Sequence, residues 1–132
     1  MFSKILEIPT FLDTNSSGTM IMIDEVMLGF SMKRNFLVKG KKGALRGRHA
    51  HKLLSQVIVC ISGKCKLFLT DGIEKKHLIL SSKSKAVLIP PMIWAEQTYL
   101  QDDTIISVFC DRYYEENDYI HNFNEYLSLN RN

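Results

Sequence analysis

Apolar and polar residues alternate along most of this chain in short runs, with turn-forming residues between the runs. A period of two is typical of β-strands that bury one face. The alternation predicts strands over these ranges: 19–24, 31–38, 46–51, 55–62, 64–70, 74–80, 86–89, 94–100 and 104–111. An opening strand region, 2–12, is interrupted by Pro9, which suits the edge of a sheet.

Turn signals support this division of the chain. A cluster of small polar residues at 13–18 predicts a turn, and the Lys- and Gly-rich segment 39–43 predicts a loop. Gly63 is expected to close a hairpin between the strands on either side, and Asp71-Gly72 to close the next hairpin. Many short strands at even spacing predict an all-β fold, either a sandwich or a jelly-roll barrel.

The C-terminal end departs from the strand pattern. Over 118–129, apolar residues fall near helical spacing, with Asn117 or Asp118 as the expected N-cap: Ile120, Phe123, Tyr126 and Leu127. We therefore expect one C-terminal helix packed on the barrel. His121 would lie on the polar surface of this helix, without a role.

Composition bounds the class of protein. With 132 residues, 45% of them apolar, we expect a single domain over 1–132. The net charge of +3 and the small lysine cluster in 39–43 do not form the basic stripe of a nucleic-acid-binding protein. No apolar run approaches the length of a membrane span and no signal peptide is visible, so a cytoplasmic location with no membrane partner is expected.

Three cysteines lie in apolar strands: Cys60, Cys65 and Cys110. An odd number in such positions favours reduced, buried thiols. A disulfide between the first two, across the turn at Gly63, is the alternative.

The candidate chemistry lies in the strand 46–51. His49 and His51 share one face of this strand, with Ala50 turned away. Ordinary half-buried strand histidines are the alternative interpretation. Gln56 is expected to face the same cavity, where it could orient one of the imidazoles.

This region resembles the first motif of the cupin family. That motif has His-x-His, a Glu about four residues later and a closing Gly, where this chain has His49, His51, Gln56 and Gly63. The counterpart of the second motif, 90–96, contains no His. Two imidazoles and a neutral amide are a poor ligand set for zinc or non-haem iron, so no metal is expected.

A narrower resemblance is to the dTDP-4-keto-6-deoxyglucose 3,4-ketoisomerases. It rests mainly on the following residues: Arg46-Gly47-x-His49-Ala50-His51-Lys52, Gln56-Val57-x-Val59-Cys60-x-x-Gly63-x-Cys65, Asp71-Gly72 and Tyr113-Tyr114-x-Glu116-x-Asp118-Tyr119-Ile120. Three positions depart from the family pattern. Ser17 replaces an Arg, Phe36 or Leu37 replaces a Tyr, and Ala95 replaces the His of a Trp-His-Glu segment.

The resemblance implies a cupin-fold homodimer with exchanged N-terminal strands. It implies an enzyme without a metal or other cofactor that moves a ketone from C4 to C3 of a dTDP-linked 4-keto-6-deoxy sugar. The product leads to 3-amino-3,6-dideoxy sugars of surface polysaccharides such as the O-antigen of lipopolysaccharide. The catalytic histidines of the family fall on His49 and His51, and its Arg on Arg46.

The residues support this chemistry independently. Moving a ketone to its neighbour requires proton transfers at carbon and at oxygen, for which the pKa of histidine is suited. We assign His51 as the base at carbon and His49 as the shuttle between hydroxyl oxygens, although the roles could be reversed. Arg46 could stabilise an enediolate or hold the diphosphate. The period of two turns Arg46 and Arg48 away from the histidines, unless a bulge or strand start at Gly47 turns Arg46 inward.

Two other functions remain open. A dTDP-4-keto sugar epimerase of related fold would invert C3 or C5, but such enzymes typically rely on a His and a Tyr, and the strand Tyr is missing here. A sugar-nucleotide-binding module without catalysis fits the loss of polar residues at three positions. Trp94 and the tyrosines at 113, 114 and 119 are interpreted as packing residues rather than as a base-stacking platform.

Overall fold

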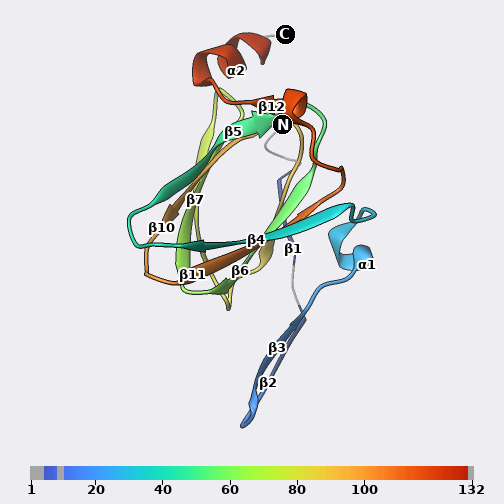
Figure 1. The fold of residues 1–132 in the computed structure, drawn as a ribbon, viewed down its shortest axis with the longest axis vertical. Helices are drawn as coiled ribbons and strands as arrows, with labels where there is room; N and C mark the ends of the chain where they lie inside the picture. The colour runs from blue at the N-terminus through green and yellow to red at the C-terminus, as the bar shows by residue number, and fades with distance from the viewer. Residues whose placement is uncertain (1–4, 9–10, 131–132) are drawn as a thin grey trace.

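Figure 1 shows a computed structural model of the protein, in which residues 5–8 and 11–130 are described. Two five-stranded sheets form a barrel. In spatial order the first contains β1 (Leu6–Ile8), β9 (Ala86–Ile89), β6 (Gln56–Ser62), β11 (Thr104–Cys110) and β4 (Arg34–Gly40). The second contains β12 (Tyr119–Ile120), β5 (Leu45–His51), β10 (Trp94–Tyr99), β7 (Lys64–Thr70) and β8 (Lys75–Ser81). Every pair of neighbouring strands is antiparallel.

The core fills the space between the two sheets. Inward-facing residues of both sheets make one apolar cluster that includes Ile58, Leu67, Ile106 and Tyr99. This is why the strands alternate between apolar and polar residues. The predicted all-β barrel with a C-terminal helix is confirmed. The three cysteines are buried free thiols, so the alternative disulfide is not formed.

Two turn predictions had different outcomes. The Asp71-Gly72 hairpin joins β7 to β8, and the Asp71 carboxylate accepts hydrogen bonds from the backbone N–H groups of Ile73 and Glu74 at 2.9 and 2.8 Å. The hairpin at Gly63 is wrong, because β6 and β7 lie in different sheets. Gly63, with φ of 78°, is where the chain crosses between sheets, against Thr104. A side chain there would clash with Thr104.

Some strands begin or end at other residues than predicted, because backbone pairing with the neighbouring strand sets their bounds. β2 (Phe11–Asn15) and β3 (Gly18–Met22) pair up to the tip of their hairpin, so the turn is shorter than 13–18. β4 begins at Arg34 instead of residue 31 and continues to Gly40, because its ladder with β11 reaches the Thr104–Gly40 pair. Near the end of this strand, Lys39 forms an exposed ion pair with Asp103 at 3.5 Å.

The C-terminal helix is shorter than expected. α2 spans Phe123–Leu129, and its N-cap is Asn122, whose side chain accepts a hydrogen bond from the Glu125 backbone N–H at 2.9 Å. The predicted caps, Asn117 and Asp118, are wrong, because the segment before α2 is occupied by a 3-10 turn (η2, Glu116–Asp118) and by β12.

β12 explains why the helix starts late. Its residue Ile120 pairs with Ala50 of β5 and packs with Ala50, Trp94 and Tyr126, which join α2 to the outer face of the second sheet. Trp94 is therefore a packing residue, as predicted. His121 lies between β12 and α2, so its placement on the helix is wrong.

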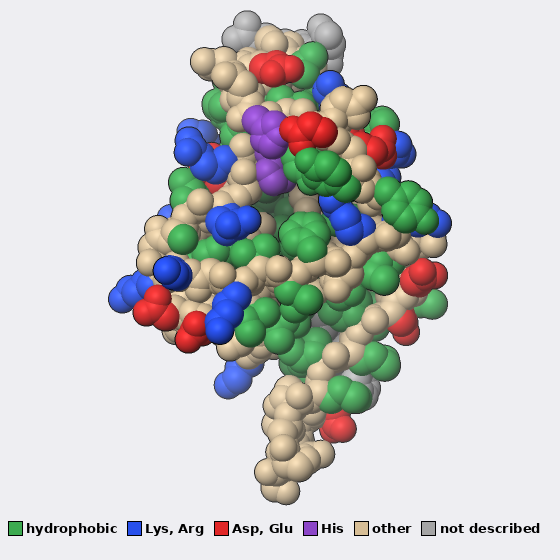
Figure 2. Space-filling view, viewed as in Figure 1, with side chains coloured by type: hydrophobic (Ala, Val, Ile, Leu, Met, Phe, Trp, Pro, Cys, Tyr) green, Lys and Arg blue, Asp and Glu red, His purple; other side chains and the backbone are tan. Residues whose placement is uncertain are grey.

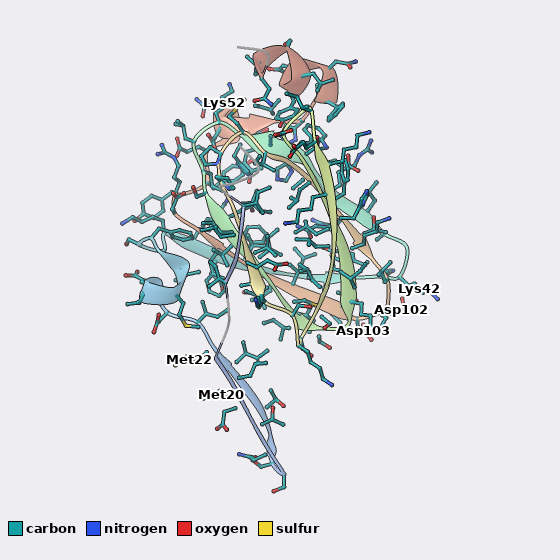
Figure 3. The ribbon with its side chains drawn as sticks, turned by 180° about the vertical axis from the view of Figure 1, so that it is seen from behind. Met20, Met22, Lys42, Lys52, Asp102 and Asp103 are labelled. Atoms are coloured by element: carbon teal, nitrogen blue, oxygen red, sulfur yellow. The ribbon has the colours of Figure 1, made fainter. Side chains whose placement is uncertain are left out.

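The N-terminal part includes an arm. The hairpin β2–β3 extends away from the barrel (Figure 1), and Figure 3 shows Met20 and Met22 along it. Both methionines are exposed, as is Leu12. β1 pairs with β9 at the edge of the first sheet, as expected for an edge strand, whereas Pro9 lies outside the described residues.

A short helix, α1 (Glu25–Leu28), connects this arm to the barrel and was not predicted. The Asp24 side chain caps it by accepting a hydrogen bond from the Met27 backbone N–H at 2.9 Å. Leu28 packs on the outer face of β6 against Val57 and Val59. In the described part of the chain, no helix has the length and apolar character needed to cross a membrane.

Candidate active site

β5 brings the two strand histidines together. The ring centroids of His49 and His51 are 4.9 Å apart and the rings are nearly perpendicular. Ala50 faces the other way, into the cluster under α2. The shared face predicted from the period of two is confirmed. Figure 2 shows histidine side chains at the rim of a hollow on one face of the barrel, among acidic, basic and apolar side chains.

A β-bulge precedes the histidines. Gly47 and Arg48 both have positive φ, 84° and 56°, and in the register with β10 His49 faces Ala95 while Gly47 faces Glu96. Arg48 is thus the extra residue. The bulge turns the Gly47 carbonyl towards the ring of His49, whose Nδ1 lies 2.9 Å from the carbonyl oxygen. A carbonyl only accepts, so Nδ1 of His49 carries the proton and Nε2 has a free lone pair.

The bulge also settles where the arginines lie. Arg46 lines a cavity of about 90 Å³ together with His49 and Gln56, which is the inward arrangement expected only if the strand bulges at Gly47. Gln56 is buried, whereas Arg46 is exposed to solvent along much of its side chain. Arg48 is exposed and lines a different pocket, together with Trp94 and His121. The structure therefore places His49, Arg46 and Gln56 at one cavity.

His51 has a partner that sequence reasoning missed. Its Nδ1 lies 3.0 Å from Oδ2 of Asp118, and both side chains are about 95% buried. The other carboxylate oxygen of Asp118 accepts the backbone N–H of Leu53 at 2.7 Å. Because a carboxylate accepts, Nδ1 of His51 donates, and its Nε2 is the free nitrogen.

Burial keeps both imidazoles neutral. Desolvation lowers the pKa of His51 to about 4, the neighbouring His49 lowers it further, and the Asp118 carboxylate offsets only part of the decrease. The pKa of His49 is also lowered, chiefly by burial. A neutral imidazole with a free Nε2 is the form that accepts a proton, so near pH 7 the pair is ready to act as base and shuttle.

Tyr119 packs against both histidines, and Arg34 lies beside Tyr119. The Tyr119 ring lies 4.4 Å from that of His51 and 5.0 Å from that of His49. Its hydroxyl is 3.5 Å from the Arg34 guanidinium, which also lies 3.6 Å from the sulfur of Cys110. Tyr119, interpreted from the sequence as a packing residue rather than part of a base-stacking platform, thus packs against both histidines.

The guanidinium of Arg34 is half-buried and poorly satisfied. Its Nε is buried without a hydrogen-bond partner, and no carboxylate of the described residues forms an ion pair with it. Its charge contributes to the low pKa of His51. Buried cations are normally paired, so this one suits an anionic group of a bound molecule.

His121 also lies at this site. Its ring stacks on that of Tyr119, with centroids 5.3 Å apart and planes 7° apart, and it lies 6.0 Å from the ring of His49. Its Nε2 is 3.3 Å from the Glu116 carboxylate. The fourth histidine, His77, is exposed on β8, as expected.

These residues do not fit a metal. Within 5–8 and 11–130 there is no group of three or more His, Cys, Asp or Glu side chains placed to hold an ion. Gln56 stands where the cupin pattern has a Glu ligand, the counterpart of the second motif has no His, and the Glu96 carboxylate accepts a hydrogen bond from the Trp94 indole at 2.8 Å. Metal-independent chemistry remains a prediction.

Comparison with known proteins shows the family to which this chain belongs. The family model described as "FdtA: WxcM-like, C-terminal" matches residues 1–131. The chain belongs to this FdtA family. A curated relative, TDP-4-oxo-6-deoxy-alpha-D-glucose-3,4-oxoisomerase of Aneurinibacillus thermoaerophilus, is 34% identical over 133 residues, covering 97% of this chain and 94% of that protein. The resemblance inferred from the histidine motif is confirmed.

Solved structures agree with this assignment to the FdtA family. The sugar 3,4-ketoisomerase QdtA of Thermoanaerobacterium thermosaccharolyticum, in complex with TDP, superposes with a TM-score of 0.92 at 28% identity, covering 99% of this chain and 97% of that chain. WlaRA of Campylobacter jejuni, a TDP-fucose-3,4-ketoisomerase, gives 0.83 at 26% identity, with 97% and 95% covered. The protein is thus an isomerase of the FdtA type.

Proposed function

We propose that the protein converts dTDP-4-keto-6-deoxyglucose to a dTDP-3-keto-6-deoxyhexose by proton transfer through an enediolate. The observation that carries this proposal is the pair of neutral imidazoles on β5, each with Nδ1 engaged and Nε2 free, in a chain of the FdtA family. One relative is named as the oxoisomerase of a TDP-4-oxo-6-deoxy sugar and another is a ketoisomerase in complex with TDP. Both support a TDP-linked keto sugar as the substrate.

The proton transfers balance within the sugar. Nε2 of His51 takes the hydrogen on C3 as a proton, which leaves an enediolate with its negative charge on the C4 oxygen. Nε2 of His49 then takes the C3 hydroxyl proton and passes it to the C4 oxygen, and C4 gains a proton from His51, so the ketone has moved to C3 without an oxidant or reductant. We assign His51 to the carbon atoms, because it is the buried base, and His49 to the oxygens.

Two arginines are available for the negative charge. Arg46 lines the cavity of His49 and is the candidate for the diphosphate, since it is also open to solvent. Arg34 is the candidate for the enediolate oxygen, since it is half-buried, lacks a carboxylate and influences His51. Gln56 would hold a sugar hydroxyl at the same cavity or orient His49.

The biological setting follows from the reaction. A 3-keto-6-deoxy sugar nucleotide is the carbonyl compound that amination at C3 requires, so the product suits synthesis of 3-amino-3,6-dideoxy sugars for surface polysaccharides such as O-antigen. Sugar nucleotides are made in the cytoplasm, and we place the protein there. No metal or organic cofactor is required by the balanced transfers.

The arm supports a homodimer with exchanged N-terminal strands. The hairpin β2–β3 leaves the barrel with Leu12, Met20 and Met22 exposed. Apolar residues on an isolated two-stranded hairpin favour contact with another surface. A second copy of the chain is the partner that the proposal names.

One observation keeps the epimerase as a second candidate. Tyr119 contacts the rings of both histidines and could supply the tyrosine that an epimerase needs. Incubation of the protein with the 4-keto sugar nucleotide in deuterated water, followed by NMR, separates the possibilities. Deuterium incorporation with a carbonyl at C3 supports the ketoisomerase, and exchange at C3 or C5 with the carbonyl still at C4 supports the epimerase. A carbonyl that stays at C4 with no exchange at any carbon would leave only a binding module, whereas a carbonyl moved to C3 supports the ketoisomerase with or without deuterium.

A further inference from the structure

One six-residue segment, 116–121, places an acid beside two of three neighbouring histidines. Asp118 lies 3.0 Å from His51, and Glu116 lies 3.3 Å from His121. His49 is between them, with ring centroids 4.9 Å from His51 and 6.0 Å from His121. The three imidazoles thus form a row.

The row runs from the interior to the solvent. The side chain of His51 is 5% exposed and that of His121 is 59% exposed, with His49 half-buried between them. The Tyr119 ring lies against all three imidazoles, within 4.4 to 5.3 Å between centroids, and fixes their spacing. The Glu116 carboxylate, 67% exposed, adds a second acceptor at the outer end.

Among the described residues, those that line the cavity of His49 include no carboxylate and no second imidazole. Its cavity is lined otherwise by apolar and amide side chains and by Arg46, whose guanidinium only donates hydrogen bonds. Ala95, opposite His49 on β10, has no ionisable group. On the side facing Tyr119, the neighbouring imidazole is that of His121. Imidazoles at this spacing can exchange a proton through one bridging water molecule.

We propose that His121, held by Glu116 and stacked on Tyr119, is the outlet of a proton relay that connects His51, through His49, with the solvent. This inference rests on the proposed ketoisomerase. It deepens that function by saying what happens to the proton removed from C3.

The relay adds an alternative path to the balanced reaction. After His51 takes the proton from C3, that proton either returns to C4 of the same molecule or passes to His49, then His121, then water. In the second case a solvent proton arrives by the same path and is delivered to C4. One proton leaves and one enters, so charge and atoms balance in both cases.

A substrate deuterated at C3 tests the relay in ordinary water. The measured quantity is the fraction of product that retains deuterium at C4, determined by NMR together with turnover. The wild-type protein is expected to lose most of the label. His121→Gln keeps a hydrogen bond to Glu116 but cannot relay protons, so retention should rise several-fold, by more than turnover falls. Added imidazole buffer should reverse the rise.

Two further variants sharpen the result. Glu116→Gln should raise retention less than His121→Gln, because the imidazole remains. His77→Gln, which removes an exposed histidine on β8 far from the row, is the matched control and should behave as wild type. Equal retention in wild type and His121→Gln, or near-complete retention in wild type, overturns the relay while isomerisation stands. If wild type does not move the carbonyl, the proposed function fails and the relay with it.

Discussion

Replacing Asp118 with Asn tests how the buried imidazole is prepared as a base. The Asp118 carboxylate accepts from His51 Nδ1 at 3.0 Å and from the Leu53 backbone N–H at 2.7 Å. An Asn side chain can keep the bond to Leu53 through its carbonyl oxygen, but its NH2 group then faces His51. His51 would have to accept at Nδ1, which moves its proton to Nε2. The nitrogen that should take the C3 proton would already be protonated.

The expected loss follows from that change. A positioned general base raises the rate on the order of a hundred- to ten-thousandfold. Most of this rate enhancement is lost if His51 adopts the wrong tautomer. We therefore expect the turnover of Asp118→Asn to fall by about 10²–10⁴. Stability should fall by only about 1–3 kcal/mol, because both side-chain hydrogen bonds are kept but no longer involve a charged group. Affinity for TDP should stay near that of wild type.

Asp111→Asn is a matched control. The carboxylate of Asp111 accepts the backbone N–H of Ser55 at 2.9 Å, as Asp118 does for Leu53, but it contacts neither histidine. Turnover is measured by NMR with the 4-keto substrate, TDP affinity by calorimetry and the His51 tautomer by nitrogen-15 shifts. A folded Asp118→Asn protein with near-normal turnover would refute the reasoning, as would an equal loss in Asp111→Asn.

The remaining predictions concern the same site and its surroundings. Because folding lowers the pKa of His51 from 6.5 to about 4, the unfolded chain binds more protons between these values. The free energy of unfolding therefore decreases, by up to roughly 3 kcal/mol, as the pH falls from about 6.5 to about 4. Urea titrations at pH 7 and pH 5 should show a smaller drop for His51→Asn than for wild type, and an equal drop would contradict the shift. Arg34→Gln should lower kcat more than it lowers TDP affinity. Arg46→Gln should weaken TDP binding more than it lowers kcat. The reverse pattern would assign the enediolate to Arg46 and the diphosphate to Arg34. Dialysis against a strong chelator should leave turnover unchanged, and activity restored by a divalent ion would defeat the metal-free mechanism. Light scattering at micromolar concentration should report a dimer; a monomer would rule out the exchanged arm.

Strand periodicity predicted much of the fold and the centre of the site. Alternation along 46–51 placed His49 and His51 on one face, because the period of a strand leaves no other arrangement for residues two apart. The bulge at Gly47 was foreseen only as an option. Its presence depends on pairing with β10, a strand about fifty residues later in the chain.

The missed features depend on contacts that local patterns do not record. Asp118 has the residue type and position of an N-cap, and nothing nearby in sequence indicates that its carboxylate meets an imidazole 67 residues earlier. A glycine between two strands is as compatible with a crossover as with a hairpin, so Gly63 could not be distinguished locally. The available signal was the segment Glu116-x-Asp118-Tyr119-Ile120, which matched the family but was used only as support.

His51→Asn provides the most direct test of the central claim that an imidazole on β5 moves the carbon-bound proton. Asn keeps much of the shape and a donor for Asp118 but has no basic nitrogen near neutral pH. In deuterated water with the 4-keto sugar nucleotide, the variant should bind TDP as wild type does, yet show neither deuterium at C3 nor a moved carbonyl. A folded His51→Asn protein that still exchanges and isomerises at near-normal rate would show that another residue is the base.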